Sequence, residues 1–408
     1  MTVTEIRSEF PILSSKVYSR PLVYLDNAAS SQRPLSVVRK LDEMSLEANA
    51  NIHRAVHALS ARATDEFEAA RDAVRKALNA EFREEIIFTS GATASVNLLA
   101  FSFGEAFVGE GDEVIVSRAE HHSNIVPWQL MCRRKGARIK VLEIDEKGEL
   151  SVEGLEKLIS QRTKIIAISQ ISNVLGCINP LREIVETAHK YGIPVLVDGA
   201  QGFVHLQTDV QELGCDFYVF SGHKVFAATG TGVLYGKKEW LDKLPPYMGG
   251  GEMIATVSFD GTTFAPLPHK FEAGTQNFNA VPTLIPALEL RNVCLSDPLL
   301  LHNIEEVKAY VLDALLSDPR ITLYGVPRRT MDKIPLFSFT VKGVHHEDLA
   351  LIMDKMGIAL RSGQMCAEPL MDYFGVSGML RASFAAYNTM DEARYFIESL
   401  DKAIKMLI

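Results

Sequence analysis

The chain has few cysteines and no long apolar run. Only five cysteines occur among 408 residues, and none forms a CxxC pair or a regular spacing. Such scattered cysteines provide no disulfide framework and no zinc-binding spacing, so we expect a protein of the reducing cytoplasm. No apolar stretch reaches the roughly 18 residues that a membrane span requires, and no membrane partner is expected. The opening segment carries acids instead of the apolar core of a secretory signal.

An excess of positive charge is also lacking. Lysine and arginine total 42 against 51 aspartates and glutamates, so the formal net charge is -9. Nucleic acid and anionic membrane surfaces are therefore not expected as main partners. Hydrophobic residues make up 47% and charged residues 23%, as is usual for a globular protein. The length suggests two or three domains, because a domain holds about 150 residues.

Short apolar segments alternate with helical patterns through the first part of the chain. Strands separated by helices of this kind are typical of parallel βαβ units, in which helices cover both faces of the sheet. The sequence therefore predicts an α/β fold with a large, mainly parallel sheet. The expected strands lie at 23–26, 86–89, 113–116, 138–142, 164–168, 195–198, 216–220 and 232–235, and the expected helices at 34–47, 60–78, 125–135 and 181–191, with another beginning after 91.

The pattern changes near residue 249. Glycine and proline break the alternation from there to residue 268, and no element is predicted in that stretch. We expect residues 25–290 to form a large ligand-binding domain, and residues 1–24 and 291–408 to form a small α+β domain. The elements expected in the last part are helices at 284–293, 304–316, 346–356 and from 390, with strands at 336–341, 358–360 and 381–384.

Lys224 is the most informative residue of the sequence. It follows a predicted strand, and Asp198 ends a neighbouring one. Ligands bind a parallel sheet beyond the carboxyl ends of its strands, which is where both residues are expected. A lysine deep in such a domain can form a Schiff base with an aldehyde cofactor, and an aspartate can keep a pyridinium nitrogen protonated. The alternatives are a solvated surface lysine and an aspartate that only caps a turn.

Other polar residues follow neighbouring strands. Thr93 lies at the predicted start of a helix, where a phosphate can bind, although an ordinary N-cap would explain it equally well. His121 and His122 point apart on most backbones, and no ligand cluster with zinc spacing accompanies them. We therefore expect no metal there and favour one histidine ring stacked on an aromatic cofactor. Asn173 follows the next predicted strand, at the same edge of the sheet.

Cys366 lies in a polar loop between a predicted strand and a predicted helix. The other four cysteines have apolar or helical surroundings, which suggest burial. Arg361 precedes Cys366 and Arg381 follows it, and nearby cations favour a thiolate. Arg381 is either a surface charge or a bidentate hydrogen-bond donor to a substrate carboxylate. A free loop cysteine is usually inert, but with Lys224 and Asp198 it suggests a thiol that collects what a cofactor releases from an amino acid.

A series of motifs along the chain resembles one family. They are Tyr24-Leu25-Asp26-Asn27-Ala28-Ala29, Asn51-Ile52-His53-Arg54, Glu120-His121-His122-Ser123-Asn124, Ser172-Asn173-Val174-Leu175-Gly176, Val197-Asp198-Gly199-Ala200-Gln201, Ser221-Gly222-His223-Lys224, Phe271-Glu272-Ala273-Gly274-Thr275, Arg381-Ala382-Ser383 and Tyr387-Asn388-Thr389. Nearly end to end, the chain resembles the group II cysteine desulfurases (SufS/CsdA type) of the class V aminotransferase family. This resemblance implies fold type I of the pyridoxal 5'-phosphate (PLP) enzymes, which is like that of aspartate aminotransferase.

The resemblance implies that PLP is held by a ring of side chains. Lys224 would form the Schiff base, and Asp198 would hold the pyridinium nitrogen. His121 would stack on the ring, and Gln201 would bond the phenolic oxygen. The remaining contacts would hold the phosphate and come from Thr93, Ser221, His223 and, from a second subunit, Thr275.

The resemblance also implies the reaction and its partners. L-Cysteine would become L-alanine, with Lys224 moving the Cα proton and Cys366 taking the sulfur as a persulfide. Asn173, Arg361 and Arg381 would orient the substrate carboxylate. A homodimer is implied, and the sulfur would pass to an acceptor of SufE/SufU type for iron–sulfur cluster assembly.

Alternatives remain beside this interpretation. A selenocysteine lyase acting on L-selenocysteine shares most of the motifs, and another class V PLP enzyme, such as an epimerase or an aminotransferase, shares the fold. A catalytically silent α/β protein would use the cleft only for packing. The sequence departs from the family at Gln364-Met365, where His-His is frequent, at Ala94, where an acid is common, and at Ala227-Ala228, where Gly-Pro is common. These departures leave the acceptor and the protonation near the thiol open.

Overall fold

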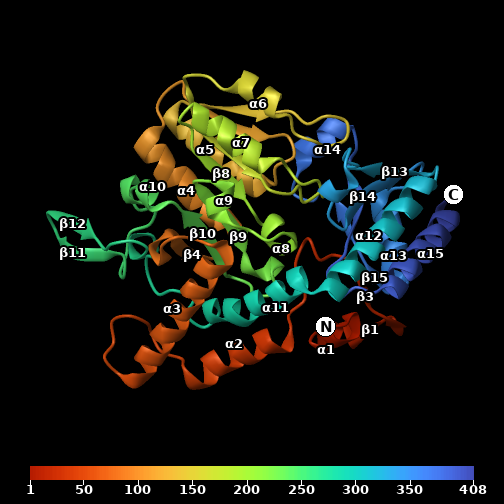
Figure 1. The fold of residues 1–408 in the computed structure, drawn as a ribbon, viewed down its shortest axis with the longest axis horizontal. Helices are drawn as coiled ribbons and strands as arrows, with labels where there is room; N and C mark the ends of the chain where they lie inside the picture. Colours follow the sequence, from red (N-terminus) through yellow and green to blue (C-terminus); the bar gives the residue numbers. More distant parts are fainter.

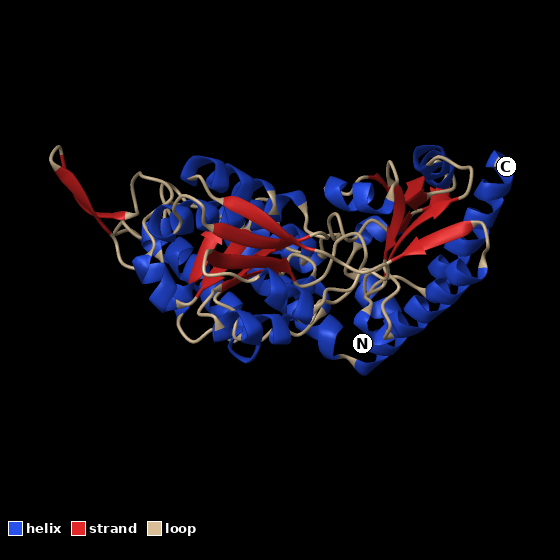
Figure 2. Cartoon of the chain, turned by 90° about the horizontal axis from the view of Figure 1, so that it is seen from above, coloured by secondary structure: helices blue, strands red, loops and turns tan.

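The computed structural model describes residues 1–408 as two parts that lie side by side. The larger part holds a seven-stranded sheet, and the smaller part holds a four-stranded sheet near the C-terminus. Figure 2 shows the two sheets at opposite ends of the elongated molecule, with loops between them. No helix combines the length and apolar character that crossing a membrane would require.

The seven-stranded sheet has the order β4-β10-β9-β8-β7-β5-β6. Its strands are β4 (Ile86–Thr89), β5 (Glu113–Ser117), β6 (Arg138–Leu142), β7 (Thr163–Ser169), β8 (Val195–Asp198), β9 (Phe217–Ser221) and β10 (Gly232–Gly236). The strands from β9 to β6 run parallel, as predicted, but β10 is antiparallel to both of its neighbours. The short connection 222–231 explains this difference, because a parallel crossover needs a dozen residues or more.

Helices cover both faces of this sheet. They are α2 (Leu35–Glu47), α3 (Ala58–Leu78), α4 (Ala92–Phe107), α5 (Val126–Lys135), α6 (Val152–Leu158), α7 (Leu181–Lys190), α8 (Gly202–His205), α9 (Val210–Leu213), α10 (Lys238–Lys243) and α11 (Leu284–Ser296). Along β7, Ile166 and Ile168 pack on the side of α3, α7 and α11, whereas Ile165 and Ala167 pack on the side of α4 and α5. Because successive strand residues alternate between two buried faces, the strands read as continuous apolar runs.

The smaller part has the sheet order β13-β14-β17-β16. Its strands are β13 (Ile321–Tyr324), β14 (Leu336–Val341), β16 (Arg361–Gly363) and β17 (Met379–Ser383), and its helices are α1 (Val3–Ser8), α12 (Pro298–Ser317), α13 (His346–Lys355), α14 (Glu368–Phe374) and α15 (Met390–Leu407). Two further pairs lie beside it, β1 (Lys16–Val17) with β2 (Arg20–Pro21), and β3 (Val23–Tyr24) with β15 (Ile358–Ala359). The sequence did not predict β13 or β16, which are short and carry few fully buried residues.

A two-stranded hairpin occupies the stretch in which no element was predicted. It consists of β11 (Ile254–Ser258) and β12 (Gly261–Phe264), and it projects from the larger part, away from the small sheet (Figures 1 and 2). Nearly all of its residues are exposed. Since neither face of the hairpin is buried within the chain, its sequence lacks the alternation that normally indicates a strand.

Candidate functional site

A cavity of about 190 Å³ lies beyond the carboxyl ends of β5, β7, β8 and β9, beside the N-terminus of α4. Strands β16 and β17 of the small sheet contribute Arg361 and Arg381 from the other side. With the exception of Thr275, every site residue predicted from the sequence lines this cavity: Thr93, His121, Asn173, Asp198, Gln201, Ser221, His223, Lys224, Arg361, Cys366 and Arg381. Thr275 is exposed elsewhere on the chain. The strand-end argument accounts for five of the lining residues, Thr93, His121, Asn173, Asp198 and Lys224, which are far apart in sequence.

Lys224 and Asp198 lie at the base of the cavity. Lys224 ends the single turn Gly222–Lys224 that follows β9, so it is not the solvated surface lysine of the alternative interpretation. Burial lowers the pKa of Lys224 and raises the pKa of Asp198, and the attraction between the two charges opposes both changes. Asp198 Oδ1 accepts a hydrogen bond from the Ala200 amide at 2.9 Å, which fixes the carboxylate at the strand end. A cationic group in the cavity would stabilise its charged form.

The first turn of α4 presents hydrogen-bond donors to the same cavity. The N-cap of this helix is Gly91, which has no side chain of its own to cap it, so the N-cap interpretation of Thr93 is wrong. Thr93 Oγ1 instead lies 2.7 Å from Ser123 Oγ. Ser221 Oγ accepts from the Ala92 amide at 2.8 Å, which leaves its own hydroxyl proton available. A helix N-terminus with two hydroxyls beside it is suited to an anion such as a phosphate.

Two neutral histidines complete the walls. Burial, followed by repulsion from Lys224, lowers the pKa of His121 to about 3. Burial also lowers the pKa of His223 to about 4. His121 Nδ1 accepts from the Ser123 amide at 3.0 Å, which fixes the orientation of the ring. An uncharged imidazole in a fixed orientation can stack on an aromatic ring, and it does not repel that ring if the ring carries a positive charge.

Arg381 has one side-chain nitrogen without a hydrogen-bond partner. Its Nη1 donates to the Asn173 carbonyl at 2.8 Å, and its Nη2 donates to Asp26 Oδ1 at 3.2 Å. Its Nε is buried without a partner. Arg361 stands directly opposite Arg381 in the β16–β17 register, with its side chain 51% exposed. A buried donor without a partner is costly, so the cavity is built to receive an acceptor such as a carboxylate.

Cys366 enters the cavity from a loop between β16 and α14. It is the one exposed cysteine, and the other four are buried, as expected. Both Met365 and Cys366 have left-handed backbone angles, with φ of 54° and 56°. The Asn173 side-chain amide donates to the Met365 carbonyl at 2.8 Å, and the His122 amide donates to the Cys366 carbonyl at 2.7 Å. These polar contacts, together with Met365 and Ala367, which are buried in the main core cluster on either side of Cys366, attach the loop to the larger part.

The sequence interpretation missed two acids of the site. Asp26, at the end of the β3 segment, pairs with Arg381 and lies 3.7 Å from Arg361. Glu120 is fully buried directly before His121, and it accepts from the Asn124 side chain at 2.8 Å. Burial raises the pKa of Glu120 to about 7. Both acids belong to motifs named in the sequence analysis. The signal that could have identified them is an acidic residue that follows an apolar segment.

Comparison with known proteins agrees with this fold. Residues 23–396 match the family described as Aminotransferase class-V, and the chain belongs to this family. It is 44% identical over 402 residues to a "Probable cysteine desulfurase" of Halalkalibacterium halodurans, covering 98% of each chain. It is 43% identical over 411 residues to a "Cysteine desulfurase" of Cronobacter sakazakii, covering 100% of this chain and 99% of the relative.

Solved structures give the same result. The crystal structure of the cysteine desulfurase CsdA (S-sulfonic acid) from Escherichia coli superposes with a TM-score of 0.90 at 40% identity, covering 100% of both chains. The apo structure of a cysteine desulfurase from Thermococcus onnurineus superposes with a TM-score of 0.92 at 34% identity, covering 100% of this chain and 99% of the other. The fold is therefore the α/β fold that the resemblance implied.

Proposed function

We propose that this chain is a PLP-dependent cysteine desulfurase that converts L-cysteine to L-alanine and leaves a persulfide on Cys366. One observation carries the proposal: the exposed thiol of Cys366 lines the same cavity as Lys224 and Asp198. The relatives named cysteine desulfurase, which cover nearly the whole chain, support it. A lyase or aminotransferase would have no need of the thiol at this position.

The residues of the cavity fit PLP. Lys224 would hold the aldehyde carbon, Asp198 the ring nitrogen, His121 the ring face and Gln201 the phenolic oxygen. Thr93, Ser221, His223 and the first amides of α4 would hold the phosphate. Lys224 and Asp198, which line one cavity, and the N-terminus of α4 beside them are the features that match the cofactor. When bound, PLP withdraws electrons from the bonds at the Cα of an amino acid.

The residues of the chain then perform the remaining tasks. Arg381 binds the substrate carboxylate through its free Nε, with Asn173 and Arg361 beside it. The lowered pKa of Lys224 allows it to accept the Cα proton and return it later. The Cys366 thiolate attacks the substrate sulfur, so that an S–S bond forms as the Cβ–S bond breaks. The carbon skeleton leaves as alanine after it regains protons.

We also propose a homodimer in which a second copy completes the phosphate site. Thr275 is exposed and lies outside the cavity of its own chain. Val257 and Phe259 of the hairpin are also exposed, and an apolar projection of this kind is suited to a protein contact. Sedimentation that showed a monomer at assay concentration would contradict this arrangement.

The persulfide must pass onward from Cys366. Because this thiol is exposed at the edge of the cavity, we propose an acceptor of SufE/SufU type and a role in iron–sulfur cluster assembly. The free cysteines support a location in the reducing cytoplasm. A pull-down with the Cys366 persulfide form that recovered no thiol-bearing acceptor would contradict the transfer.

The central experiment follows the sulfur. The purified protein is incubated with L-cysteine in the absence of reductant, and its peptides are mapped by mass. We expect one added sulfur on the Cys366 peptide and alanine in solution, with neither in Cys366→Ser. Cys294→Ser, which changes a buried cysteine, is the matched control and should retain both products. Alanine without the adduct would favour direct release of the chalcogen, as in a selenocysteine lyase, and the absence of alanine would overturn the proposal.

A further inference from the structure

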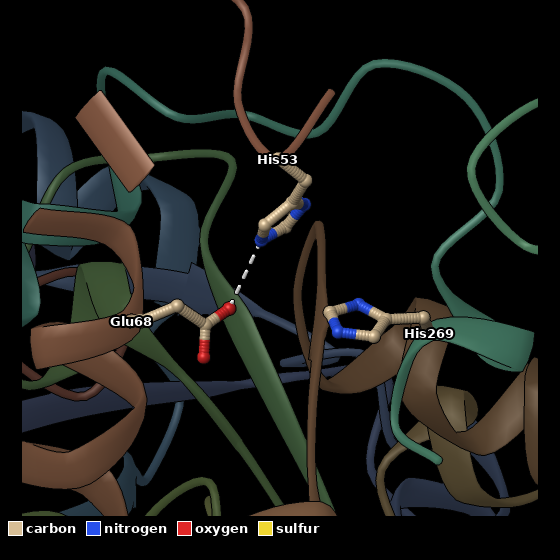
Figure 3. A group of neighbouring side chains, drawn as sticks. All are labelled: His53, Glu68 and His269. Carbon is tan, nitrogen blue, oxygen red and sulfur yellow. Dashed lines mark hydrogen bonds and ion pairs between the residues drawn. The ribbon is translucent and has the colours of Figure 1, made fainter. Parts of the chain in front are cut away.

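Three side chains from separate segments meet outside the cavity. His53 lies in the connection between α2 and α3, Glu68 lies on α3, and His269 lies in the short turn His269–Phe271 that follows the hairpin. One ligand atom of each lies within 4.8 Å of the other two. Figure 3 shows the two imidazole rings facing the carboxylate of Glu68 from different sides. None of these residues lines the PLP cavity.

The distances suit a small metal ion. His53 Nε2 lies 3.2 Å from Glu68 Oε1. Nitrogen and oxygen ligands about 2.0–2.1 Å from a tetrahedral Zn²⁺ are themselves separated by about 3.3 Å, so this pair already has the required spacing. A ligand nitrogen of His269 lies within 4.8 Å of a ligand atom of each of the other two residues, and its side chain is 36% exposed. Solvent exposure at this position also provides a route for the ion.

Neighbouring charges orient the carboxylate. Arg71 donates to both oxygens of Glu68, from Nε at 3.1 Å and from Nη2 at 3.2 Å. Arg71 also contacts Glu272 at 2.8 Å, and Arg83 lies 2.9 Å from Asp72 and 3.5 Å from Glu68. Two arginines thus face three carboxylates, Glu68, Asp72 and Glu272, so one negative charge remains in excess. Carboxylates that bind metals are usually held by such outer hydrogen bonds.

We propose that His53, Glu68 and His269 bind a divalent transition-metal ion, for which Zn²⁺ is the best match. Two imidazoles and one carboxylate are ligands that zinc accepts, and with only three protein ligands a fourth position stays open to water. The ion would connect the segment before α3 to the base of the hairpin. Arg54, next to His53, already pairs with Glu252 at 3.1 Å across the same two segments. The metal would therefore brace the projecting hairpin.

A shared proton is the competing explanation. A proton on His53 would balance the charge of Glu68 without any metal, and His269 would then be only a neighbour. The two explanations differ at His269, because the proton needs a single histidine whereas the metal needs both.

The test is a calorimetric titration of ZnCl₂ into chelator-treated holoenzyme that carries Cys366→Ser, so that the reactive thiol cannot bind zinc. We expect one Zn²⁺ per chain. His269→Ala in this background should weaken binding at least about tenfold, because loss of a direct ligand costs at least as much as loss of an outer contact. His302→Ala is the matched control, since His302 is an exposed histidine 3.5 Å from Glu306 on α12.

A second measurement guards against a folding artefact. CoCl₂ in place of ZnCl₂ should give ligand-field absorption in the parent protein and in His302→Ala but not in His269→Ala, whose melting temperature should match that of the parent. Equal zinc affinity in the parent, His53→Ala and His269→Ala would show an adventitious ion only and would overturn the proposal. Loss in His53→Ala alone would also overturn it, because His269 would then not be a ligand.

Discussion

Lys224 and Cys366 face one cavity from surroundings that differ in burial and in backbone. We call the ends of β5, β7, β8 and β9 the lysine side, and the segment from Arg361 to Cys366 with β17 the thiol side. The lysine side rests on strands whose residues are almost all buried. On the thiol side, Cys366 is exposed and stands in left-handed backbone next to another such residue.

The difference follows from the tasks of the two sides. Groups that move protons on a bound substrate must be held within a fraction of an ångström, and packing in a core supplies this precision. A thiol that receives sulfur and passes it to another protein must reach both, so an exposed position on a loop suits it. The comparison implies that changes on the lysine side abolish chemistry, whereas changes on the thiol side, apart from Cys366 itself, adjust substrate binding and access.

The largest effect is expected for Lys224→Arg. Arginine keeps the positive charge but does not lose its proton near neutral pH, so it cannot accept the Cα proton. We expect alanine formation to fall at least about a thousandfold, within the range that general acid–base catalysis contributes. Steady-state alanine production from L-cysteine is the measurement.

Lys270→Arg is the matched control for this change. Burial lowers the pKa of Lys270 as well, but this lysine lies outside the cavity and donates to the Asp242 carbonyl at 3.2 Å. The rate of alanine formation in Lys270→Arg should equal that of the parent protein. If Lys224→Arg kept more than a tenth of the parent rate, Lys224 would not be the proton carrier, and the lysine side would lose its central role.

Much of the lysine side could be predicted from the sequence. Asp198 and Lys224 follow apolar strands that are buried on both faces, and such strands are the strongest local signal in a chain. Once the strands are placed, their carboxyl ends meet at one edge of the sheet. The antiparallel direction of β10 could not be obtained this way, because strand direction depends on connection length as well as on apolar pattern.

The next effect concerns the two opposed arginines of the thiol side. Arg381→Lys removes Nε and the planar guanidinium that also holds the Asn173 carbonyl and Asp26, and it leaves the carboxylate with a single point charge. We expect kcat/KM for L-cysteine to fall about 10- to 100-fold, mostly through KM. Arg361→Lys should cost only a few-fold, because the side chain of Arg361 is half exposed and its interactions are screened by water.

Initial rates over a range of L-cysteine concentrations distinguish the two variants. Retention of the cofactor's visible absorption in both would show that the fold is intact. Equal losses in the two variants would contradict the assignment of the carboxylate to the buried Nε of Arg381, and would place the substrate nearer the exposed rim.

The thiol side was harder to predict from the sequence. Arg361 was expected after a strand, but β16 is only three residues long and its pairing with β17 is a tertiary contact. The backbone angles of Met365 and Cys366 carry no signal, since neither residue type favours the left-handed region. Asp26 was missed because its partner, Arg381, is distant in sequence and only the folded chain brings them together.

A smaller effect, on the pH dependence of stability, should distinguish the lysine side from the thiol side. The folded pKa of His121 is about 3 against an ordinary value of 6.5. Between these values the unfolded chain binds a proton that the folded chain does not, so stability falls as pH drops below 6.5. His121→Phe removes this contribution, about 1 kcal/mol at pH 5 after allowance for partial exposure. The drop in melting temperature of cofactor-free protein from pH 7.5 to 5 should shrink.

His302→Phe is the control for the pH effect, because this histidine is exposed on α12. Its melting temperature should change with pH as in the parent protein. If the melting temperature of His121→Phe changed with pH as in the parent protein, the His121 ring would be protonated in the folded parent. The lysine side would then be more open to water than the thiol side.

The smallest effect tests how the thiol loop is attached. His122 Nε2 accepts from the Glu368 amide at 3.0 Å at the start of α14. Removing this bond in His122→Ala should cost about 0.5 kcal/mol because the contact is partly exposed. The loop would then open more often, and iodoacetamide should alkylate Cys366 two- to threefold faster, with the modified peptide followed by mass. His345→Ala removes an equivalent bond to the Glu347 amide on α13 and should leave the rate unchanged. If both variants reacted at the parent rate, the Cys366 loop would already be open, and its exposure alone would distinguish the thiol side from the lysine side.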